Sequence, residues 1–385
     1  MSDEMEAVEQ TALARRRLAY TFLGMTTGAV VLLMLVVSSG QNLRSVLGSN
    51  TLTNLASSNS VTIKSLEASS TRVYYAQLKG SEKKSLFDDY KTQYSKSYSS
   101  DDEDTRYKNF KKFLERIDER NDAEALADNS AVHGVTQFAD LSDDEVKKYL
   151  LGYKAADKEA KRKLKSSKLA KVAKVEKYKG SSTTVDWADT YTTSVSDQGY
   201  CGSCWAYSAT EQLESDSIRM GYLTTDDKLS VQQLVSCDTT DLGCNGGNTE
   251  TAYAYIEEAG GVALSETYPY TSYFDITGTC TMDDDTELAV TLSKYYTLSS
   301  EDDMQSYVLA TGPLSICAAA STWTSYKSGV VSTCDNDVDH CIQITGVNTD
   351  RSVCCRRRFF FFFSYFYFLS SSRVSLSVLS VLSVH

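Results

Sequence analysis

The sequence predicts an α+β fold in which a two-lobed globular domain follows a charged helical segment and an apolar N-terminal segment. Three observations support this class. Residues 18–37 carry no charged side chain. Residues 86–123 are highly charged but repeat apolar side chains every three or four positions, as amphipathic helices do. From Val185 to Asp350 helical patterning comes first and strand-like alternation follows, the order expected for two separate lobes.

The composition limits the possible function classes. The chain has 385 residues, enough for one large domain or two smaller ones with an ample core. Its formal net charge of -12 argues against a nucleic-acid partner. Ten cysteines are many for a cytosolic protein and favour an oxidising compartment.

The N-terminus agrees with export. Residues 1–17 form an acidic head, expected to be cytosolic, that ends in three arginines, and the apolar run 18–37 follows. A helix of this length spans roughly the 30 Å of a bilayer core. The run is a signal peptide or a signal anchor of a single-pass type II membrane protein, with a soluble core helix as the alternative. Residues 38–85 show no strong period and are expected to be a stalk or linker.

The charged segment is expected to form two helices that break near its serines and need a surface to pack against. Residues 154–180 are rich in lysine and arginine and predict a solvated, protease-accessible linker, with a basic patch for nucleic acid or lipid as the alternative. The apolar positions that define the helical pattern are Phe87, Tyr90, Tyr94, Tyr107, Phe110, Phe113, Leu114 and Ile117.

Within the globular domain we predict helices over 206–220, 230–235 and 248–259. Strands are predicted within 288–298, 312–320 and 340–347. Residues 351–385 are a low-complexity tail without Gly, Asn, Gln, Trp, Asp or Glu. We interpret this tail as non-native read-through across an exon boundary, with a genuine hydrophobic tail as the alternative.

The motif QGYCGSCWAYSA, residues 198–209, places Cys201 and Cys204 three positions apart. A structural zinc site would need a second pair of ligands, and the sequence offers neither a further C-x-x-C nor enough histidines. A thioredoxin-like dithiol would need a surrounding βαβ pattern, which is missing. The remaining interpretation is a reactive cysteine beside a structural one, without a metal or other cofactor.

A thiolate nucleophile makes demands that the sequence meets. Cys204 begins a predicted helix, whose N-terminus lowers a thiol pKa. His340 is the only histidine of the globular segment and is the candidate base. Gln198 and the backbone N–H of Cys204 could stabilise an oxyanion.

These residues resemble the active-site signature of the papain-like cysteine proteases. The likeness extends to SCDTTDLGCNGGN (236–248), YPY (268–270), GPLSI (312–316) and VDHCIQITGVN (338–348). It implies a papain-like two-lobed domain, with a helical lobe and a β-barrel-like lobe. It further implies a cysteine-type endopeptidase that acts on proteins or peptides through a Cys–His pair and is expected to be monomeric.

The charged helical segment resembles the inhibitory I29-type propeptide of the same family. The likeness implies an inhibitory propeptide over 86–152 that runs backwards through the cleft, a Lys-rich processing linker over 153–181 and a truncated peptidase domain over 182–350. The residues that carry it are Asp102, Arg106, Phe110, Phe113, Ile117, Asn121 and the motif Gly134–Asp140.

The family pattern also implies disulfides Cys201–Cys244 and Cys237–Cys280, and substrate contacts from Gly246, Gly247 and Asp339. Cys317 and Cys341 would line the main specificity pocket. There they either form a bridge or, as we expect, remain two small buried side chains.

The likeness breaks after Asp350, where the family's orienting asparagine and its Asn-Ser-Trp-Gly block are missing. We therefore expect the closing strands of the second lobe to be lost, activity to be weakened and Cys334 to lack its partner. The alternative function is an inactive homologue whose propeptide inhibits related thiol proteases. The expected location is a lysosome, a vacuole or the extracellular space.

Overall fold

The computed structural model describes residues 61–69, 72–127, 131–158, 161–162, 164, 170–172, 177–298, 300–331, 337–348, 358–363, 366–370 and 381–384. The chain divides into two compact units, residues 1–89 and 90–385. None of the described helices is both long and apolar enough to cross a bilayer. The apolar run 18–37 lies outside the described residues.

The first unit contains regular structure within the range expected to be a stalk. Helix α4 (Ile63–Glu67) is capped by Thr62, whose hydroxyl accepts from the N–H of Ser65 while the Ser65 side chain accepts from the N–H of Thr62. A short 3-10 helix (Tyr75–Gln77) and α5 (Gly80–Gln93) follow. The N–H of Ile63 donates to the carboxylate of Asp89 at 2.8 Å. A five-residue helix is too short to give a detectable period in the sequence.

The second unit begins with the expected propeptide. Helix α6 (Ser100–Leu126) buries one face, and the break between α5 and α6 falls at the serines, as predicted. Strand β1 (Val132–His133) pairs antiparallel with β6 (Tyr326–Ser328). Helix α7 (Asp143–Tyr149) starts with a capping box between Ser142 and Glu145. The buried face of α6 consists of Phe110, Phe113, Leu114, Ile117, Asp118 and Glu124.

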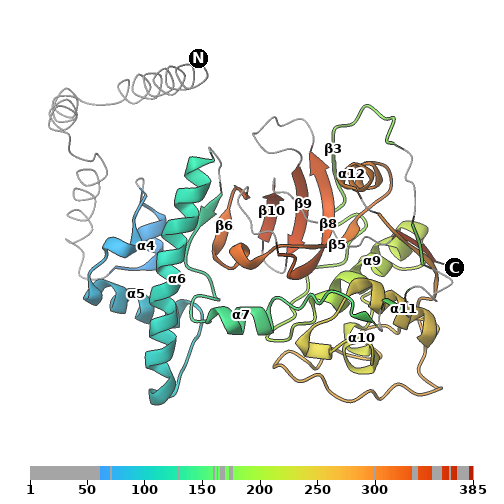
Figure 1. Cartoon of the computed structure of the whole chain (residues 1–385), viewed down its shortest axis with the longest axis horizontal. Coiled ribbons are helices and arrows are strands. Elements are labelled where there is room, and N and C mark those ends of the chain that lie inside the picture. Colours follow the sequence, from blue (N-terminus) through green and yellow to red (C-terminus); the bar gives the residue numbers. More distant parts are fainter. Residues whose placement is uncertain are drawn as a thin grey trace. The chain divides into compact units, whose positions relative to one another are not determined.

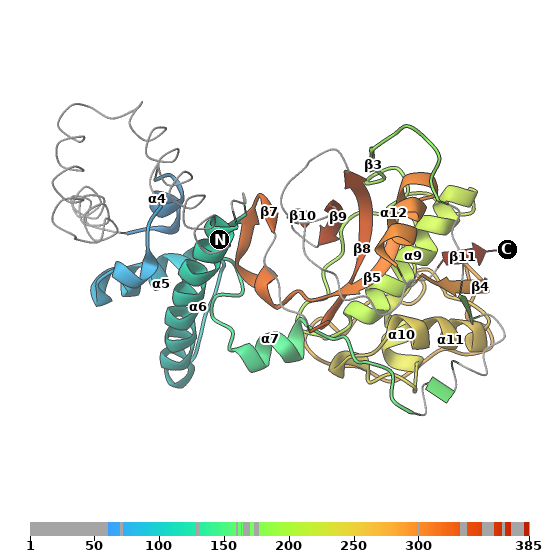
Figure 2. The ribbon, with the colours of Figure 1, turned by 45° about the horizontal axis from the view of Figure 1, so that its top comes forward.

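The helical lobe consists of α9 (Cys204–Met220), α10 (Val231–Cys237) and α11 (Thr249–Ala259), close to the predicted ranges. Both α9 and α11 end at a glycine with positive φ, Gly221 and Gly260, because glycine adopts the left-handed conformation without a Cβ penalty. Helix α9 is almost completely buried. Figures 1 and 2 show it between the strands of the second lobe and the pair α10 and α11.

The second lobe is built on a sheet with the strand order β3-β8-β9-β10-β7, in which β5 also pairs with β8. Helix α12 (Glu301–Ala310) adds Met304, Tyr307 and Val308 to the apolar core of this lobe. The strands are β3 (Thr184–Asp186), β5 (Leu314–Ala318), β7 (Val330–Val331), β8 (His340–Asn348), β9 (Arg358–Phe363) and β10 (Phe366–Ser370).

The expected loss of the closing strands is wrong for the described backbone. Strand β9 pairs antiparallel with β8, and β10 pairs with both β9 and β7. A smaller sheet joins β4 (Leu292–Thr297) to β2 (Ala170–Val172) and β11 (Val381–Val384). An unpaired edge of β8 would leave backbone groups unsatisfied, and residues 358–363 supply the missing partners.

Candidate active site

Cys204 is the first residue of α9, and the loop before it is held rigidly. A disulfide joins Cys201 to Cys244, and the N–H of Gly202 donates to the carbonyl oxygen of Cys244 at 2.9 Å. A Cβ on Gly202 would lie 2.6 Å from that oxygen, so the loop requires glycine there. The Cys204 sulfur therefore lies at a helix N-terminus, where unpaired backbone N–H groups point outward.

His340 is the first residue of β8, which packs directly on α9. The hydroxyl of Ser208 donates to the carbonyl oxygen of Ile342 at 2.7 Å, and Nε2 of Gln343 donates to the carbonyl oxygen of Glu211 at 2.9 Å. Cys341, the residue after His340, packs in one buried cluster with Cys204. The structure thus brings the two lobes' candidate catalytic residues to one site.

Gln198 contacts both the propeptide and the loop before Cys204. Its Nε2 donates to the carbonyl oxygens of Tyr149 and Leu150, at 3.2 Å each, and to that of Cys201 at 2.9 Å. The carbonyl group of Leu150 also lies near the His340 imidazole, where it partly offsets the lowering of the imidazole pKa by burial. Two candidate catalytic side chains therefore converge on one propeptide carbonyl group.

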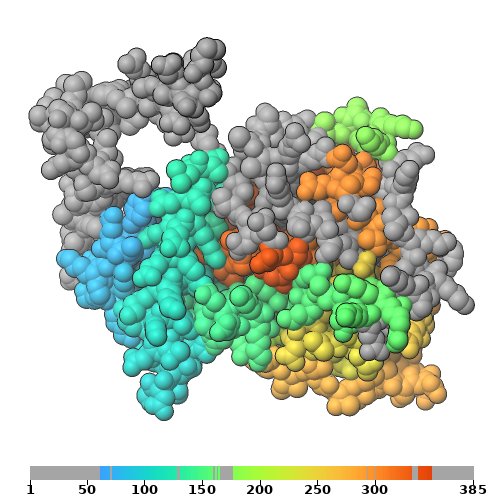
Figure 3. Space-filling view, viewed as in Figure 1, coloured from blue at the N-terminus to red at the C-terminus, as the bar shows by residue number. Residues whose placement is uncertain are grey.

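The next propeptide residues pair with the glycine strand of the helical lobe. Gly247 donates its N–H to Gly152 and accepts from the N–H of Lys154, both at 2.8 Å, in a parallel bridge centred on Tyr153. The carbonyl oxygen of Asp339 accepts from the N–H of Tyr153 at 3.0 Å. In Figure 3 the green part of the chain after α7 crosses the surface between the yellow helical lobe and the orange and red second lobe.

The close approach of the two backbones depends on glycine on both sides. Gly246 has a φ of +106°, and a Cβ there would lie 2.5 Å from the carbonyl oxygen of Gly152. A Cβ on Gly152 itself would overlap the carbonyl group of Gly202. Gly246, Gly247 and Asp339, the expected substrate contacts, all lie against the propeptide.

Burial keeps the candidate catalytic pair uncharged. Cys204 and His340 are 1% and 2% exposed. Loss of hydration raises the pKa of the Cys204 thiol to about 11 and lowers the pKa of the His340 imidazole to about 4. Burial thus favours the neutral thiol and the neutral imidazole in the zymogen. The thiolate expected at the start of α9 stays a prediction for the enzyme after the propeptide has left.

Three disulfides lie within the described residues. Cys201–Cys244 and Cys237–Cys280 are the two pairs implied by the family likeness. The third joins Cys317 to Cys341, so the expectation of two unbridged side chains is wrong there. The register of β5 and β8 sets these two cysteines directly opposite each other, which a sequence without known strand pairing does not reveal. Cys334, Cys354 and Cys355 lie outside the described residues.

The propeptide docks on β6 and on the 3-10 helix before it, Ser321–Ser325. The Arg120 guanidinium donates to the carbonyl oxygen of Ser321 at 3.0 Å, to the hydroxyl of Ser325 at 2.6 Å and to that of Thr324 at 3.2 Å. The Oδ1 atom of Asn121 accepts from the N–H of His133 at 2.8 Å, and its Nδ2 donates to the carbonyl oxygen of His133 at 2.9 Å.

His133 is buried at this junction, with 3% exposure. Its Nδ1 lies 2.9 Å from the Ser325 hydroxyl, while Nε2 has no hydrogen-bond partner among the described residues. Burial, with the Arg120 charge as a second cause, lowers the pKa of His133 to about 4. This role could not be predicted from the sequence, because a strand of two residues leaves no alternating pattern.

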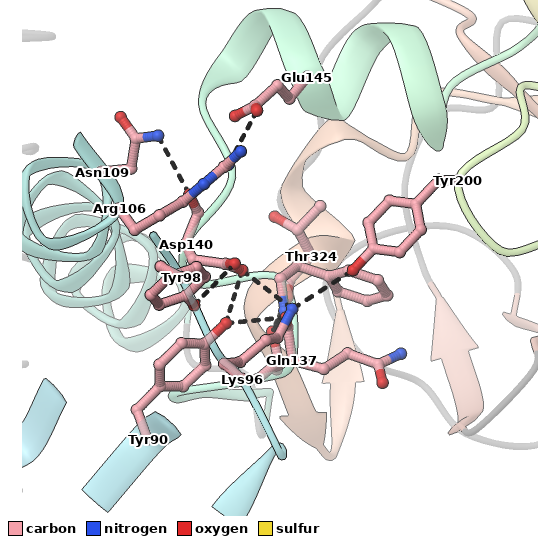
Figure 4. Close-up of polar contacts among 12 residues, drawn as sticks. Tyr90, Lys96, Tyr98, Arg106, Asn109, Gln137, Asp140, Glu145, Tyr200 and Thr324 are labelled. Carbon is pink, nitrogen blue, oxygen red and sulfur yellow. Dashed lines mark hydrogen bonds and ion pairs between the residues drawn. The ribbon is translucent and has the colours of Figure 1, made fainter. Parts of the chain in front are cut away.

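A buried carboxylate, Asp140, organises the rest of the propeptide (Figure 4). It accepts from the hydroxyls of Tyr90 and Tyr98, at 2.6 and 2.9 Å, and from Nζ of Lys96 at 3.2 Å. Lys96 also reaches the hydroxyl of Tyr200, 3.4 Å away. Burial, reinforced by the Asp140 charge, raises the pKa of both Tyr90 and Tyr98.

Arg106 and Asp102, two of the residues that carry the propeptide likeness, form an ion pair near this carboxylate. Arg106 pairs with Glu145 at 2.8 Å and with Asp102 at 3.4 Å, and it donates to the carbonyl oxygen of Asp140 at 3.3 Å. Asn109 donates to the same oxygen at 3.1 Å. Arg106 and Asp140 are among the residues named from the sequence, but Glu145 is not. The Ser-x-x-Glu pattern of residues 142–145 predicts a capped helix start and could have indicated it.

Across the described ranges, no group of three or more His, Cys, Asp or Glu side chains could hold a metal ion. A buried cysteine at a helix N-terminus, a histidine at the start of the neighbouring strand and a propeptide backbone that covers both fit a cysteine hydrolase in a latent state.

Comparisons with known proteins agree with this class. Residues 181–361 match the papain family cysteine protease, and residues 87–146 match the cathepsin propeptide inhibitor domain (I29). Cysteine proteinase 1 of Dictyostelium discoideum is 33% identical over 71% of this chain and 80% of that protein. A viral cathepsin of Adoxophyes honmai nucleopolyhedrovirus is 30% identical over 69% of this chain and 79% of that protein.

Solved structures agree as well. The digestive procathepsin L2 proteinase from Tenebrio molitor larval midgut has a TM-score of 0.64 and 27% identity, over 77% of this chain and 98% of that one. The chain belongs to the papain family of cysteine proteases. It is a zymogen with an I29 propeptide, so the recognition made from the sequence is confirmed.

Proposed function

We infer that this zymogen yields an endopeptidase in which Cys204 is the nucleophile and His340 its general base. The supporting observation is the Leu150 carbonyl group, which accepts from Gln198 and lies near His340 while Gly247 pairs with the residues that follow. A propeptide carbonyl thus lies where the chemistry requires a scissile carbonyl. The inactive inhibitor considered from the sequence is not favoured.

The reaction follows from these positions. Once the propeptide leaves, His340 accepts the proton of Cys204, and the thiolate attacks the carbonyl carbon of a peptide bond. The Gln198 amide and the backbone N–H of Cys204 stabilise the oxyanion. The imidazolium then protonates the leaving amine, and water hydrolyses the acyl-enzyme. Gly246, Gly247 and Asp339 would pair with the substrate backbone in the direction opposite to the propeptide.

Latency has two parts in this proposal. The propeptide blocks the cleft, and it also keeps the thiol and the imidazole neutral by excluding water. Its release rehydrates both groups, and the N-terminus of α9 then favours the thiolate by about 0.3–1 kcal/mol. No asparagine follows Asp350 to hold the imidazole, so we expect a slower enzyme than one with a fixed imidazole.

We propose that processing occurs within residues 153–181 and gives a monomeric peptidase that begins near residue 182, keeps strands β9 and β10 and acts on proteins or peptides. The chain is exposed from Lys179 to Thr184, where β3 begins, which suits protease access. We further propose delivery through the secretory pathway by residues 18–37 to a lysosome, a vacuole or the cell exterior. Three disulfides fit an oxidising route.

An active-site probe tests this function. After processing at acidic pH, a peptidyl epoxide or vinyl sulfone should label Cys204, and fluorogenic peptides should be hydrolysed. Cys204→Ala should abolish both signals, whereas Cys237→Ala with Cys280→Ala should keep the label. Unchanged hydrolysis by Cys204→Ala would remove this cysteine from the mechanism.

A further inference from the structure

The glycine strand of the helical lobe, residues 246–247, is held from behind by the side chain of Asp241. The Oδ1 atom of Asp241 accepts from the N–H of Asn248 at 2.9 Å, and a Cβ on Gly247 would lie 2.7 Å from the same oxygen. The N–H of Leu242 donates to the carbonyl oxygen of Gly246 at 2.9 Å and closes the loop. The position of the glycine strand therefore depends on the Asp241 carboxyl group.

A second carboxyl group lies against the first. Asp238 is 5% exposed, and its Oδ1 accepts from the N–H groups of Thr240 and Asp241, at 2.7 and 3.4 Å. The Oδ2 atom of Asp241 is buried as well. Burial, followed by the charge of Asp238, raises the pKa of the Asp241 carboxyl group from 3.8 to about 8. Two buried neighbours of like charge are costly, so the pair retains one proton at neutral pH.

Uncharged side chains from two helices pack around Asp241. The ring of Trp205, on α9, lies against Gly247, where a Cβ would come within 2.6 Å of it. Thr251, on α11, partly offsets the rise in the pKa of Asp241. Both helices belong to the peptidase domain, so these neighbours stay in place when the propeptide leaves.

Titratable side chains from two elements also face this loop. Tyr255, on α11, lies near Asp238: burial raises the pKa of the tyrosine, and the Asp238 charge adds to the rise. Lys154 of the propeptide packs against Gly246, because a Cβ there would lie 3.0 Å from two of the lysine carbons. The processed enzyme therefore keeps the two carboxyl groups but loses this nearby cation.

Resting on the endopeptidase cleft proposed above, we propose that Asp241 is a positioning residue, which holds the glycine strand in place for the substrate backbone while it shares a proton with Asp238. Without that proton, two buried negative charges repel each other, and Asp241 moves away from the strand. The held state is fully favoured below pH 3.8 and is lost as the pH rises through 8. Asp241 touches no reacting atom, so the effect should appear in KM rather than in kcat.

Kinetics of the acid-processed full chain on an uncharged fluorogenic peptide test this between pH 5.5 and 9. Asp241→Leu should raise KM about three- to tenfold at pH 5.5, the loss expected for one hydrogen bond, with kcat changed less than about twofold. Asp241→Asn should restore the lower KM, because its amide keeps an oxygen for the N–H of Asn248 and donates to Asp238.

The pH profile is the second readout and does not require Asp241→Leu to fold. Wild-type KM should rise at least about threefold between pH 7 and 9, and Asp241→Asn should abolish this rise because the amide cannot ionise. Asp284→Asn is the matched control, since it removes one exposed carboxylate from the same domain and should keep the wild-type profile. An equal rise of KM in the wild type and in Asp241→Asn would overturn the proposal.

Failure of the proposed function gives a different result. A wild-type KM for Asp241→Leu, in protein whose Cys204 is labelled by the probe, would overturn only the positioning role of Asp241. If the wild type shows no labelling of Cys204 at all, the proposed function fails instead, before any KM can be measured.

Discussion

The Nε2 atom of Gln198 donates a hydrogen bond to the carbonyl oxygen of Leu150 at 3.2 Å. The Leu150 carbonyl group also lies near the His340 imidazole, where it partly offsets the lowering of the imidazole pKa by burial. A single propeptide carbonyl group therefore lies against both the candidate oxyanion donor and the candidate base. Inhibition thus depends on the path of the backbone of residues 150–154 through the cleft. Substituting the glycines that permit this path is the most direct test.

Gly152→Ala should abolish latency. Its Cβ would overlap the carbonyl group of Gly202, which the disulfide loop before Cys204 holds in place, so the propeptide backbone must leave the cleft. We expect probe labelling of Cys204 in the unprocessed zymogen at neutral pH to rise at least tenfold. Gly80→Ala is the matched control, because a Cβ there meets no atom within 4 Å. Equal labelling of the two variants would contradict this route.

His133 should make propeptide docking acid-labile. Burial lowers its pKa from 6.5 to about 4, so docking favours the neutral imidazole. The stabilisation is complete above pH 6.5 and is lost as the pH falls towards 4, on the order of 3 kcal/mol in total. Protonation would place a second charge beside Arg120 and leave Nε2–H without an acceptor.

His133→Leu removes this titration and keeps an apolar side chain of similar size. We expect the variant to process more slowly than the wild type between pH 6.5 and 4, with the midpoint of propeptide release shifted to lower pH. Processing would be followed by gel analysis across this pH range. A midpoint that is the same in both proteins would show that other groups control release.

The sequence predicted the elements whose signals are local. Helix α9 and strand β8 begin at or within two residues of the predicted positions, and the glycine after α9 is the stop that the pattern requires. Cys204 was nominated by the C-x-x-C motif at the start of a predicted helix, and His340 was nominated as the only histidine of the globular segment.

Features that depend on tertiary contact could not be predicted. Strand β9 forms because β8 offers an edge, whereas the composition of residues 358–363 gives no period. The bridge from Cys317 to Cys341 depends on strand register. The raised pKa of the Cys204 thiol follows from its burial, and no pattern in a single sequence reveals which residues bury it.

The buried carboxyl group of Glu214 should make the peptidase domain more stable at acidic pH than at neutral pH. It is 4% exposed and accepts from the Thr193 hydroxyl and the N–H of Leu229, each at 2.7 Å. Burial still raises its pKa from 4.5 to about 7. Stability from this group is therefore present below pH 4.5 and lost as the pH rises through 7, on the order of 3 kcal/mol.

Thermal unfolding monitored from pH 4.5 to 8 checks this. Wild-type Tm should fall as the pH rises, and Glu214→Gln should reduce that dependence because the amide cannot ionise. Part of the dependence should persist, since burial also raises the pKa of Glu211, to about 8. An unchanged slope in the variant would assign the pH dependence to other groups.

Two disulfides close loops of identical length, so removing each in turn distinguishes an effect on stability from an effect on catalysis. Cys201–Cys244 and Cys237–Cys280 both close a sequence separation of 43 residues, so their loss should cost similar free energies of unfolding, about 4 kcal/mol by chain entropy. Only Cys201 lies in the loop that positions Gln198 and Cys204, because Gln198 donates to its carbonyl oxygen at 2.9 Å.

We therefore expect the double variant Cys201→Ala with Cys244→Ala to lose at least tenfold in the rate of probe labelling at Cys204. The double variant Cys237→Ala with Cys280→Ala should lose a comparable amount of Tm but keep its labelling rate. Denaturant unfolding and labelling kinetics on the same acid-processed samples measure both quantities. Parallel losses of labelling in the two variants would mean that the first disulfide contributes only stability, since equal loop closure then explains both results.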